Sequence, residues 1–252
     1  MTTTDPHAAH PVPDVLPDPW EVLRGTRWPS LETAYGSGAK LPRVLARLLD
    51  EDLTVPGARE ALGGLEPVRH QNTIYGATPA AALFVAALLA RRAQGRSGAA
   101  DGVDALLLDW LADLAHDFDD GCVAAGDRYF DGRYLDGYPA MVAVRALRPV
   151  LHRAVEPFLD DPDAAVRDTA LAAALAFAEH DALAPHRDGL AARARRLLLA
   201  DGTRWRRHQA LDALTAWGHD TTGLTRPGDD NRSPYTTDQP LPDAGFTDTP
   251  PF

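Results

Sequence analysis

The C-terminal half of this chain contains an internal repeat that limits the folds it can adopt. The segment 160–183 (DDPDAAVRDTALAAALAFAEHDAL) can be laid over 200–224 with an offset of 40 residues. At this offset an aspartate and an arginine recur: Asp161 with Arg167, and Asp201 with Arg207. A period of this length is typical of helical pairs, and a single pair cannot bury its apolar face alone. We therefore expect several helical pairs that stack on one another.

The rest of the chain favours the same fold class. From residue 18 to residue 221, apolar residues recur at helical spacing in segments broken by Gly, Pro or Asp, and no segment alternates as a strand does. This pattern predicts an all-α domain with some nine or ten helices and no sheet. The flanking segments 1–17 and 222–252 are rich in Pro and Thr and show no helical period. We expect them to be disordered tails.

The segment 155–177 (VEPFLDDPDAAVRDTALAAALAF) resembles a HEAT repeat. It has a proline in the first helix, an acidic turn, then Val-Arg and an Ala-rich second helix. The segment 41–65 resembles an earlier copy whose turn is one residue longer. In this family, the turn aspartate and the helix arginine form a ladder between successive repeats. The resemblance implies an α-solenoid of HEAT-like helical hairpins, and a ladder role for four residues: Asp161, Arg167, Asp201 and Arg207.

The pattern between about residues 28 and 220 is similar to that of HEAT-repeat proteins common in actinobacteria. Some of these relatives sit beside polymorphic toxins and are thought to act as immunity proteins, whereas most have no assigned role. The resemblance concerns the fold and says little about chemistry. It nevertheless adds an inhibitory, immunity-type role to the functions that we consider.

A polar cluster stands directly before the long apolar run at 77–90, in the segment RHQNTIYGATPAAALFVAALLA. Thr78 is a good N-cap and Pro79 suits the first turn of a helix. The segment His70–Gly76 is therefore predicted to connect two helices. Three side chains in it would either satisfy open backbone groups at the helix ends or contribute to a binding site: His70, Gln71 and Tyr75.

The most unusual segment, 109–138, combines many aspartates and aromatic residues with only two arginines. Two apolar-Asp-Gly units, at 130–132 and 135–137, predict tight turns in an irregular loop. Three interpretations remain open: a solvated acidic surface over packed aromatic rings, a calcium site at 117–121, and a protein-binding patch. The EF-hand register is absent. For the protein-binding patch, the candidate residues are His70, Gln71, Tyr75, Asp117, Asp119, Asp120, Tyr129, Asp131, Tyr134 and Asp136.

The formal net charge of −11 disfavours a nucleic-acid partner and favours a basic protein. Only the arginine-rich segment 187–209 could bind nucleic acid, and its arginines could equally pair with the acidic turns of neighbouring repeats. A HEAT-like fold does occur in one class of DNA alkylation glycosylases. The residue types used there are present as Trp205, Trp217 and Asp212.

Motifs for catalysis are missing from the sequence. It contains neither a Gly-x-Ser-x-Gly elbow nor a His-Glu-x-x-His pair, and its one cysteine, Cys122, lacks an evident base. We expect no catalytic residue, no cofactor and no metal. No secretory signal is evident and the longest apolar run is too short to span a membrane. A cytoplasmic protein with no membrane partner is therefore expected, and its oligomeric state is left open.

The predicted function is a non-catalytic protein-binding module, most concretely an immunity protein that occludes a basic partner. The alternatives are a nucleic-acid enzyme of the glycosylase type and a neutral assembly scaffold. The sequence favours a binding protein over an enzyme.

Overall fold

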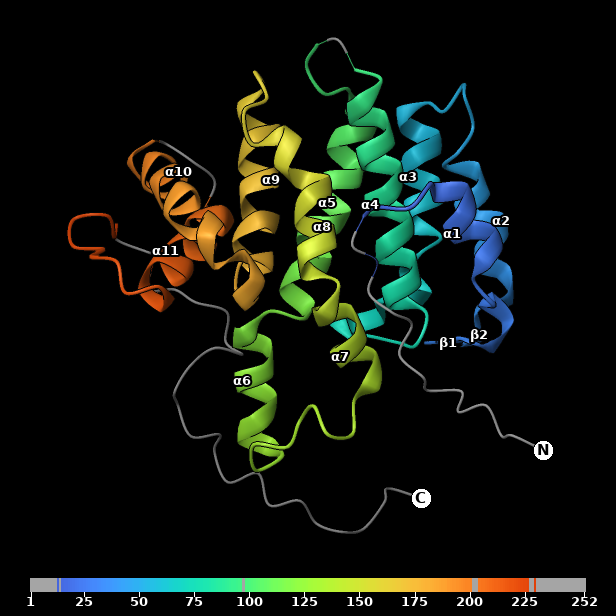
Figure 1. Cartoon of the computed structure of the whole chain (residues 1–252), viewed down its shortest axis with the longest axis horizontal. Helices are drawn as coiled ribbons and strands as arrows, with labels where there is room; N and C mark the ends of the chain where they lie inside the picture. The colour runs from blue at the N-terminus through green and yellow to red at the C-terminus, as the bar shows by residue number, and fades with distance from the viewer. Residues whose placement is uncertain (1–12, 14, 97, 201–203, 227–228, 230–252) are drawn as a thin grey trace, which may run out of the picture.

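The computed structural model describes residues 13, 15–96, 98–200, 204–226 and 229, and it is mostly helical (Figure 1). The all-α class is thereby confirmed. The α-helices are α1 (Pro19–Gly25), α2 (Leu41–Arg47), α3 (Val55–Gly63), α4 (Thr78–Gln94), α5 (Gly102–Asp117), α6 (Asp120–Tyr129), α7 (Pro139–Ala146), α8 (Arg148–Val155), α9 (Ala164–Phe177), α10 (Arg187–Leu199) and α11 (Arg204–Ala216). The 3₁₀ helices are η1 (Trp28–Ser30), η2 (Gly38–Lys40), η3 (Glu66–Val68), η4 (His70–Asn72), η5 (Glu156–Phe158) and η6 (Asp181–His186).

One short hairpin contradicts the expectation of no sheet. Strands β1 (Glu32–Thr33) and β2 (Gly36–Ser37) pair in antiparallel register, with Thr33 opposite Gly36. The Thr33 hydroxyl donates to the Gly36 carbonyl over 2.9 Å, and Gly36 adopts a φ of 101°, which favours glycine. Each strand has two residues, so no alternation of polar and apolar residues could reveal it.

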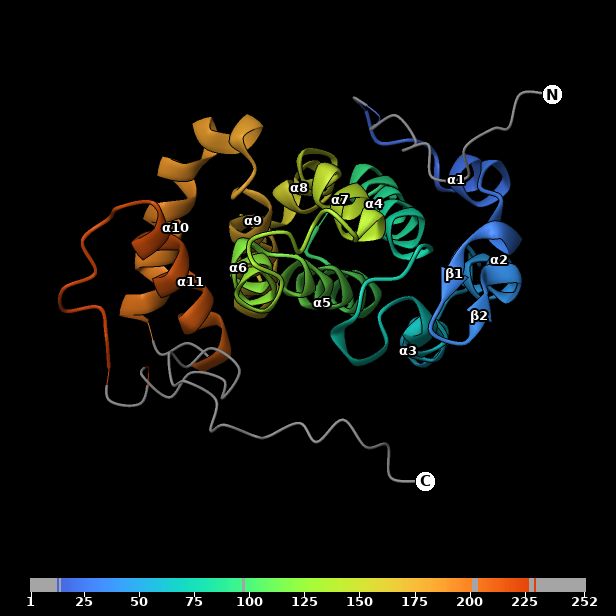
Figure 2. The same cartoon turned by 90° about the horizontal axis from the view of Figure 1, so that it is seen from below.

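The helices pack in two rows (Figures 1 and 2). Helices α1, α4 and α8 contact one another in succession, and so do α3, α5, α9 and α11. Helix α9 also contacts α8 of the other row, and every residue from Thr169 to Phe177 is buried. Most of these residues are alanine, whose small side chain lets neighbouring helices approach from several sides. Phe177 stacks on Phe118, with ring centroids 6.2 Å apart, and both side chains are fully buried.

Helix α6 and the segment that joins it to α7 extend away from the two rows, at the bottom of Figure 1. The start of α6 is held to the rows by a hydrogen-bond network around the buried Arg148. Arg148, at the start of α8, donates to the Asp120 carboxylate (3.0 Å), to the Phe118 carbonyl (2.7 Å) and to the Glu179 carboxylate (2.8 Å). The Asp120 backbone N–H also donates to Glu179 over 2.7 Å. The network joins the α5–α6 junction to α8 and to the end of α9.

Many aspartates of this acidic chain are N-caps. Asp18, Asp101, Asp119 and Asp163 each accept a hydrogen bond from a backbone N–H in the first turn of the helix that follows. Asp101 and Asp104 form a capping box at the start of α5. Part of the negative charge therefore stabilises helix ends, where the helix dipole favours it.

The predicted domain limits of 18 and 221 fall inside packed structure. Leu16 packs against the core, Leu224 is buried, and Asp229 forms an ion pair with Arg207 over 2.9 Å. Most of the predicted tails, 1–17 and 222–252, lies outside the described residues. Contacts with the helices thus extend a few residues into each segment that was expected to be a tail.

The ladder residues have the following contacts. The Asp161 carboxylate accepts from the Ala100 N–H (2.9 Å) and lies 3.3 Å from the Arg96 guanidinium, so it joins the α4–α5 connection to the start of α9. Arg167 donates to the Asp161 backbone carbonyl over 2.6 Å. Arg207 is buried and binds Asp229 and the Leu224 carbonyl. Asp201 lies outside the described residues, so the ladder between successive repeats stays a prediction.

Candidate partner-binding surface

Asp117, a predicted contact residue, is the last residue of α5 and is buried. Its carboxylate accepts a hydrogen bond of 2.6 Å from the Arg69 Nε–H. Burial raises the pKa of Asp117, and the Arg69 hydrogen bond opposes that shift. The pair fastens the segment before α4 to the end of α5. Asp117 is therefore engaged inside the protein and is not presented to a partner.

Asp119 and Asp120 are also bound within the chain. Asp119 caps α6 by accepting from the Cys122 N–H over 2.6 Å, and its other oxygen lies 3.3 Å from His116 Nδ1. Burial opposes ionisation of Asp120, but its hydrogen bonds with Arg145 and Arg148 outweigh burial and lower its pKa. The carboxylates of 117–121 are thus separately partnered, which does not support the calcium interpretation.

Residues 120–129 of the acidic segment form α6, and residues 130–138, which contain both apolar-Asp-Gly units, form the predicted irregular loop. Asp131 and Gly132 take positive φ values of 52° and 73° just after the helix, and the Gly132 N–H donates to the Asp127 carbonyl over 2.9 Å. This is the hydrogen bond that closes a Schellman motif. The first predicted turn therefore ends α6.

Aromatic rings follow one another along the α6–α7 connection. Phe130 and Tyr134 have ring centroids 5.6 Å apart, and Tyr134 meets Tyr138 edge-on at 5.4 Å. The Tyr134 ring lies over Gly126 of α6, where an added Cβ would come within 2.5 Å of the ring. Tyr129 and Phe130 are 68% and 57% exposed, whereas Tyr134 is half-buried. We call the five residues Tyr129, Phe130, Asp131, Tyr134 and Asp136 the aromatic tip.

Tyr138 joins the aromatic tip to the segment before α4. Its hydroxyl donates to the Ile74 carbonyl (2.7 Å) and accepts from the Ile74 N–H (2.9 Å), and burial raises its pKa to about 12. The prediction that His70–Gly76 connects two helices is confirmed. The structure thus joins the start of α7 to the connector before α4, through residues 64 positions apart in sequence.

The three polar candidates of the connector differ in their surroundings. His70 pairs with Glu66 and lies 3.2 Å from the Tyr35 hydroxyl. Gln71 is exposed, with a φ of 50°, and Tyr75 is half-buried. Thr78 is the first residue of α4 rather than its N-cap, one residue from its predicted place, and its hydroxyl accepts from the Tyr75 N–H over 2.9 Å.

The arginine-rich segment uses its side chains within the fold. Arg193 binds both oxygens of Asp160, over 2.6 and 2.8 Å. Arg187 donates to the Ala178 and Glu179 carbonyls and lies over the Trp217 ring. Arg206 donates to the Ala165 carbonyl and lies 3.6 Å from Asp109.

These contacts confirm that arginines of this segment pair with acidic and carbonyl groups of neighbouring helices. The side chains of Arg204 and Trp205 lie outside the described residues. Asp212, the acidic residue of the glycosylase alternative, is exposed on α11.

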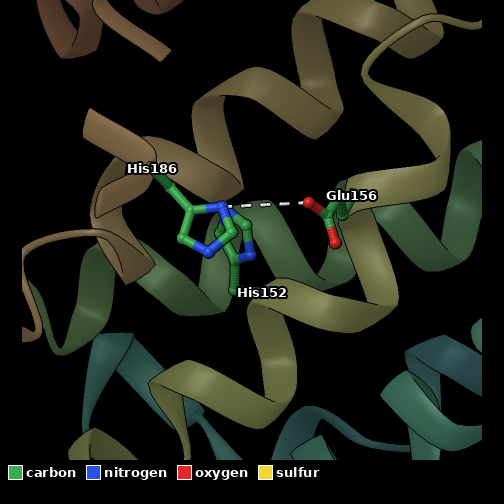
Figure 3. A group of neighbouring side chains, drawn as sticks. All are labelled: His152, Glu156 and His186. Carbon is green, nitrogen blue, oxygen red and sulfur yellow. Dashed lines mark ion pairs between the residues drawn. The ribbon is translucent and has the colours of Figure 1, made fainter. Parts of the chain in front are cut away.

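One group of side chains was missed by the sequence analysis, which expected no metal ligand. His152, Glu156 and His186 come together at the surface beside α8 (Figure 3). The His152 and His186 rings have centroids 4.8 Å apart, and the His186 Nδ1 lies 3.8 Å from Glu156. Burial, followed by the positive potential of His186 and Arg153, lowers the pKa of His152 to about 4.

The helical spacing of His152 and Glu156 was visible in the sequence, but His186 stands 34 positions after His152 and only the fold brings it close.

Comparisons with models of protein families, with curated proteins and with solved structures found no match for this chain. None of the helices in the described part of the chain has the length and apolar character needed to cross a membrane.

Proposed function

We propose that this chain is a non-catalytic protein-binding module that contacts its partner through the aromatic tip. The observation that carries the proposal is the exposure of Tyr129 and Phe130 on a part of the molecule that extends away from the helical rows (Figure 1). Tyrosine and phenylalanine are both enriched at protein interfaces, and tyrosine is among the residues that most often carry the binding energy.

The aromatic tip is braced before any partner arrives. The Asp127 carboxylate accepts from the Tyr134 N–H over 3.0 Å, and the Tyr138 hydroxyl is held by both backbone groups of Ile74. A contact surface that is fixed in advance loses less conformational entropy on binding, which leaves more of the interaction energy as affinity. These contacts support a surface built for recognition.

The net charge of the chain indicates which class of partner it would bind. With a formal net charge of −11, the chain attracts a basic protein at long range and speeds their encounter. Because Asp117, Asp119 and Asp120 bind internal partners, we assign the anchoring energy to the aromatic rings and only steering to the overall charge. An inhibitor that occludes a basic partner, as an immunity protein does, is the most concrete form of this proposal.

The fold supports the same proposal. Two rows of helices in successive contact are the arrangement expected for HEAT-like hairpins, and such solenoids commonly serve as binding surfaces. We propose that residues 18–221 form a solenoid of this kind, with the aromatic tip projecting from its α6–α7 connection.

The test is affinity capture from the cells that naturally make the protein, with three baits. These are the wild type, the double variant Tyr129→Ala/Phe130→Ala, and the control Leu199→Ala. Leu199 is 70% exposed at the end of α10, so the control removes an equally exposed apolar side chain elsewhere. We expect the wild type and the control to retain one basic protein at low salt, and the double variant to lose it.

With the captured protein purified, the double variant should bind it at least about 30-fold more weakly, the loss typical of anchor residues. Inhibition of the partner's activity by the wild type, but not by the double variant, would support the immunity-type role. Equal binding by all three baits would contradict the proposal, and recovery of nucleic acid alone would favour the glycosylase-type alternative.

A further inference from the structure

A second site lies apart from the aromatic tip, where α8 and η5 meet the start of α10. His152 is in the last turn of α8, and Glu156 follows one helical turn later at the start of η5. His186 ends η6 and directly precedes α10. Figure 3 shows the two imidazole rings side by side, with the Glu156 carboxylate directed toward His186 Nδ1.

We propose that His152, Glu156 and His186 bind one divalent metal ion of the borderline class, for which Zn²⁺ fits best. This inference is independent of the proposed function, because none of the three residues belongs to the aromatic tip.

The first support is an unpartnered buried atom. His152 is 1% exposed, and its Nε2 atom has no hydrogen-bond partner among the described residues. Most buried polar side-chain atoms in folded proteins have a partner, so this nitrogen calls for an explanation. Neighbouring side chains offer two further ligand atoms beside this ring, and an ion bound between them would satisfy the imidazole nitrogen.

The donor set selects the kind of ion. Two imidazoles and one carboxylate suit Zn²⁺ and similar first-row ions, whereas Mg²⁺ and Ca²⁺ prefer sites made of oxygen ligands. A tetrahedral Zn²⁺ ion would keep one position for water. Glu156 and His186 have half-exposed side chains, so water can reach the site from solvent.

Small movements of side chains would bring the three ligand atoms to the distances of a metal site. One ligand atom from each residue lies within 4.8 Å of the others. Bonds of about 2.0–2.1 Å in a tetrahedral site place ligand atoms about 3.3 Å apart. The side chains of His186 and Glu156 are 43% and 50% exposed, so rotation about their side-chain bonds can close this difference around the fixed His152 ring.

Two arginines stand close in sequence to the proposed ligands. Arg153 follows His152 and its charge contributes to the positive potential at that ring. Arg187 follows His186, but its guanidinium donates to the Ala178 and Glu179 carbonyls. Glu156 is the one carboxylate among the ligands and supplies the opposing charge. A bound ion would join the end of α8 to the start of α10 and stabilise the fold between them.

The test uses the purified full chain without an affinity tag, stripped of metal with a chelator. Zn²⁺ binding is measured by isothermal titration calorimetry, Co²⁺ binding by its visible d–d absorption, and the melting temperature is recorded with and without Zn²⁺. Variants Glu156→Gln and His186→Ala change exposed ligands, so they should fold. His70→Ala is the matched control, because His70, like His186, lies beside a glutamate side chain.

We expect one Zn²⁺ ion per chain and a higher melting temperature with Zn²⁺, because an ion that binds only the folded state stabilises it. Each ligand variant should weaken binding by more than about 10-fold and change the Co²⁺ spectrum, and the control should behave as the wild type. Absence of saturable binding, unchanged binding in both ligand variants, or an equal loss in the control would overturn the proposal.

Discussion

Arg148 should be the side chain whose removal most disturbs the attachment of α6. It is buried, and it donates to Asp120, to Glu179 and to the Phe118 carbonyl. Replacing it by methionine keeps most of the volume but removes the positive charge. The two carboxylates would then face each other with only Arg145, which binds Asp120, to compensate them.

The magnitude follows from this arrangement. Removing one partner of a buried ion pair usually costs about 3–5 kcal/mol, because the other charge stays buried without compensation. Arg145 still binds Asp120 and also donates to the Phe118 carbonyl over 2.6 Å. The side chains of Asp120 and Glu179 are 54% and 21% exposed, so solvent also screens the charges that are left. We therefore expect a loss below that range, about 2 kcal/mol of the free energy of unfolding.

The penalty should also depend on pH. Burial raises the pKa of Glu179 above its ordinary value, and Arg148 counteracts this shift. In Arg148→Met the folded-state pKa of Glu179 rises further. A raised folded-state pKa gives stability that is present at low pH and is lost as the pH increases through that pKa. The variant should therefore lose more stability at pH 8 than at pH 5.

The assay is urea unfolding followed by circular dichroism at both pH values, for wild type, Arg148→Met and the double variant Arg148→Met/Glu179→Gln. Arg153→Met, on the exposed side of the same helix, is the control and should change stability by no more than about 0.5 kcal/mol. Adding Glu179→Gln should recover part of the loss, since the uncompensated charge is removed. A cost below about 1 kcal/mol for Arg148→Met, or no recovery in the double variant, would refute this reasoning.

Three further predictions concern the α6–α7 region. Tyr138→Phe removes the hydroxyl that binds the Ile74 N–H and carbonyl, and it should lower the free energy of unfolding by about 1–3 kcal/mol in urea unfolding. Tyr129→Phe is the control and should not change it, and an equal loss in both variants would contradict the Tyr138–Ile74 hydrogen bonds. Gly126→Ala should destabilise by about 1–3 kcal/mol because the new Cβ meets an aromatic ring, although helix propensity alone favours alanine. Gly189→Ala, with open space around it, is the control and should not destabilise; a gain in both variants would show that the ring does not lie there. Burial raises the pKa of Cys122 to about 11, so its alkylation by iodoacetamide at pH 8 should be about 100-fold slower than that of free cysteine. The rate should increase as the pH rises toward this pKa. A rate at pH 8 equal to that of free cysteine would contradict the raised pKa.

The sequence predicted the features that depend on neighbouring residues. Helical spacing of apolar residues gave the all-α class, and the Thr-Pro pair placed the start of α4 within one residue. The start of a helix can be predicted from the sequence because N-cap and first-turn residues act within one helical turn. The hairpin at Glu32–Ser37 was missed because two-residue strands carry no periodic signal.

The sequence could not show which partners the charged side chains take. Asp117 was predicted to face a partner, but it pairs with Arg69, 48 residues earlier. His186 joins His152 for the same reason, that distant segments pack side by side. Runs of acidic residues look alike whether they cap helices, form buried pairs or meet solvent. Only the packing distinguishes these roles, and it leaves Tyr129 and Phe130 at the aromatic tip as well-exposed aromatic side chains.

Recognition of the partner through the aromatic tip can be tested by photo-crosslinking in the cells that naturally make the protein. A benzophenone amino acid would replace Phe130 in one form of the chain and Leu199 in another, since both positions are well exposed. Irradiation should join one basic protein to the form labelled at position 130 and leave the form labelled at position 199 free of it. A partner crosslinked equally at both positions, or at position 199 alone, would contradict recognition through the aromatic tip.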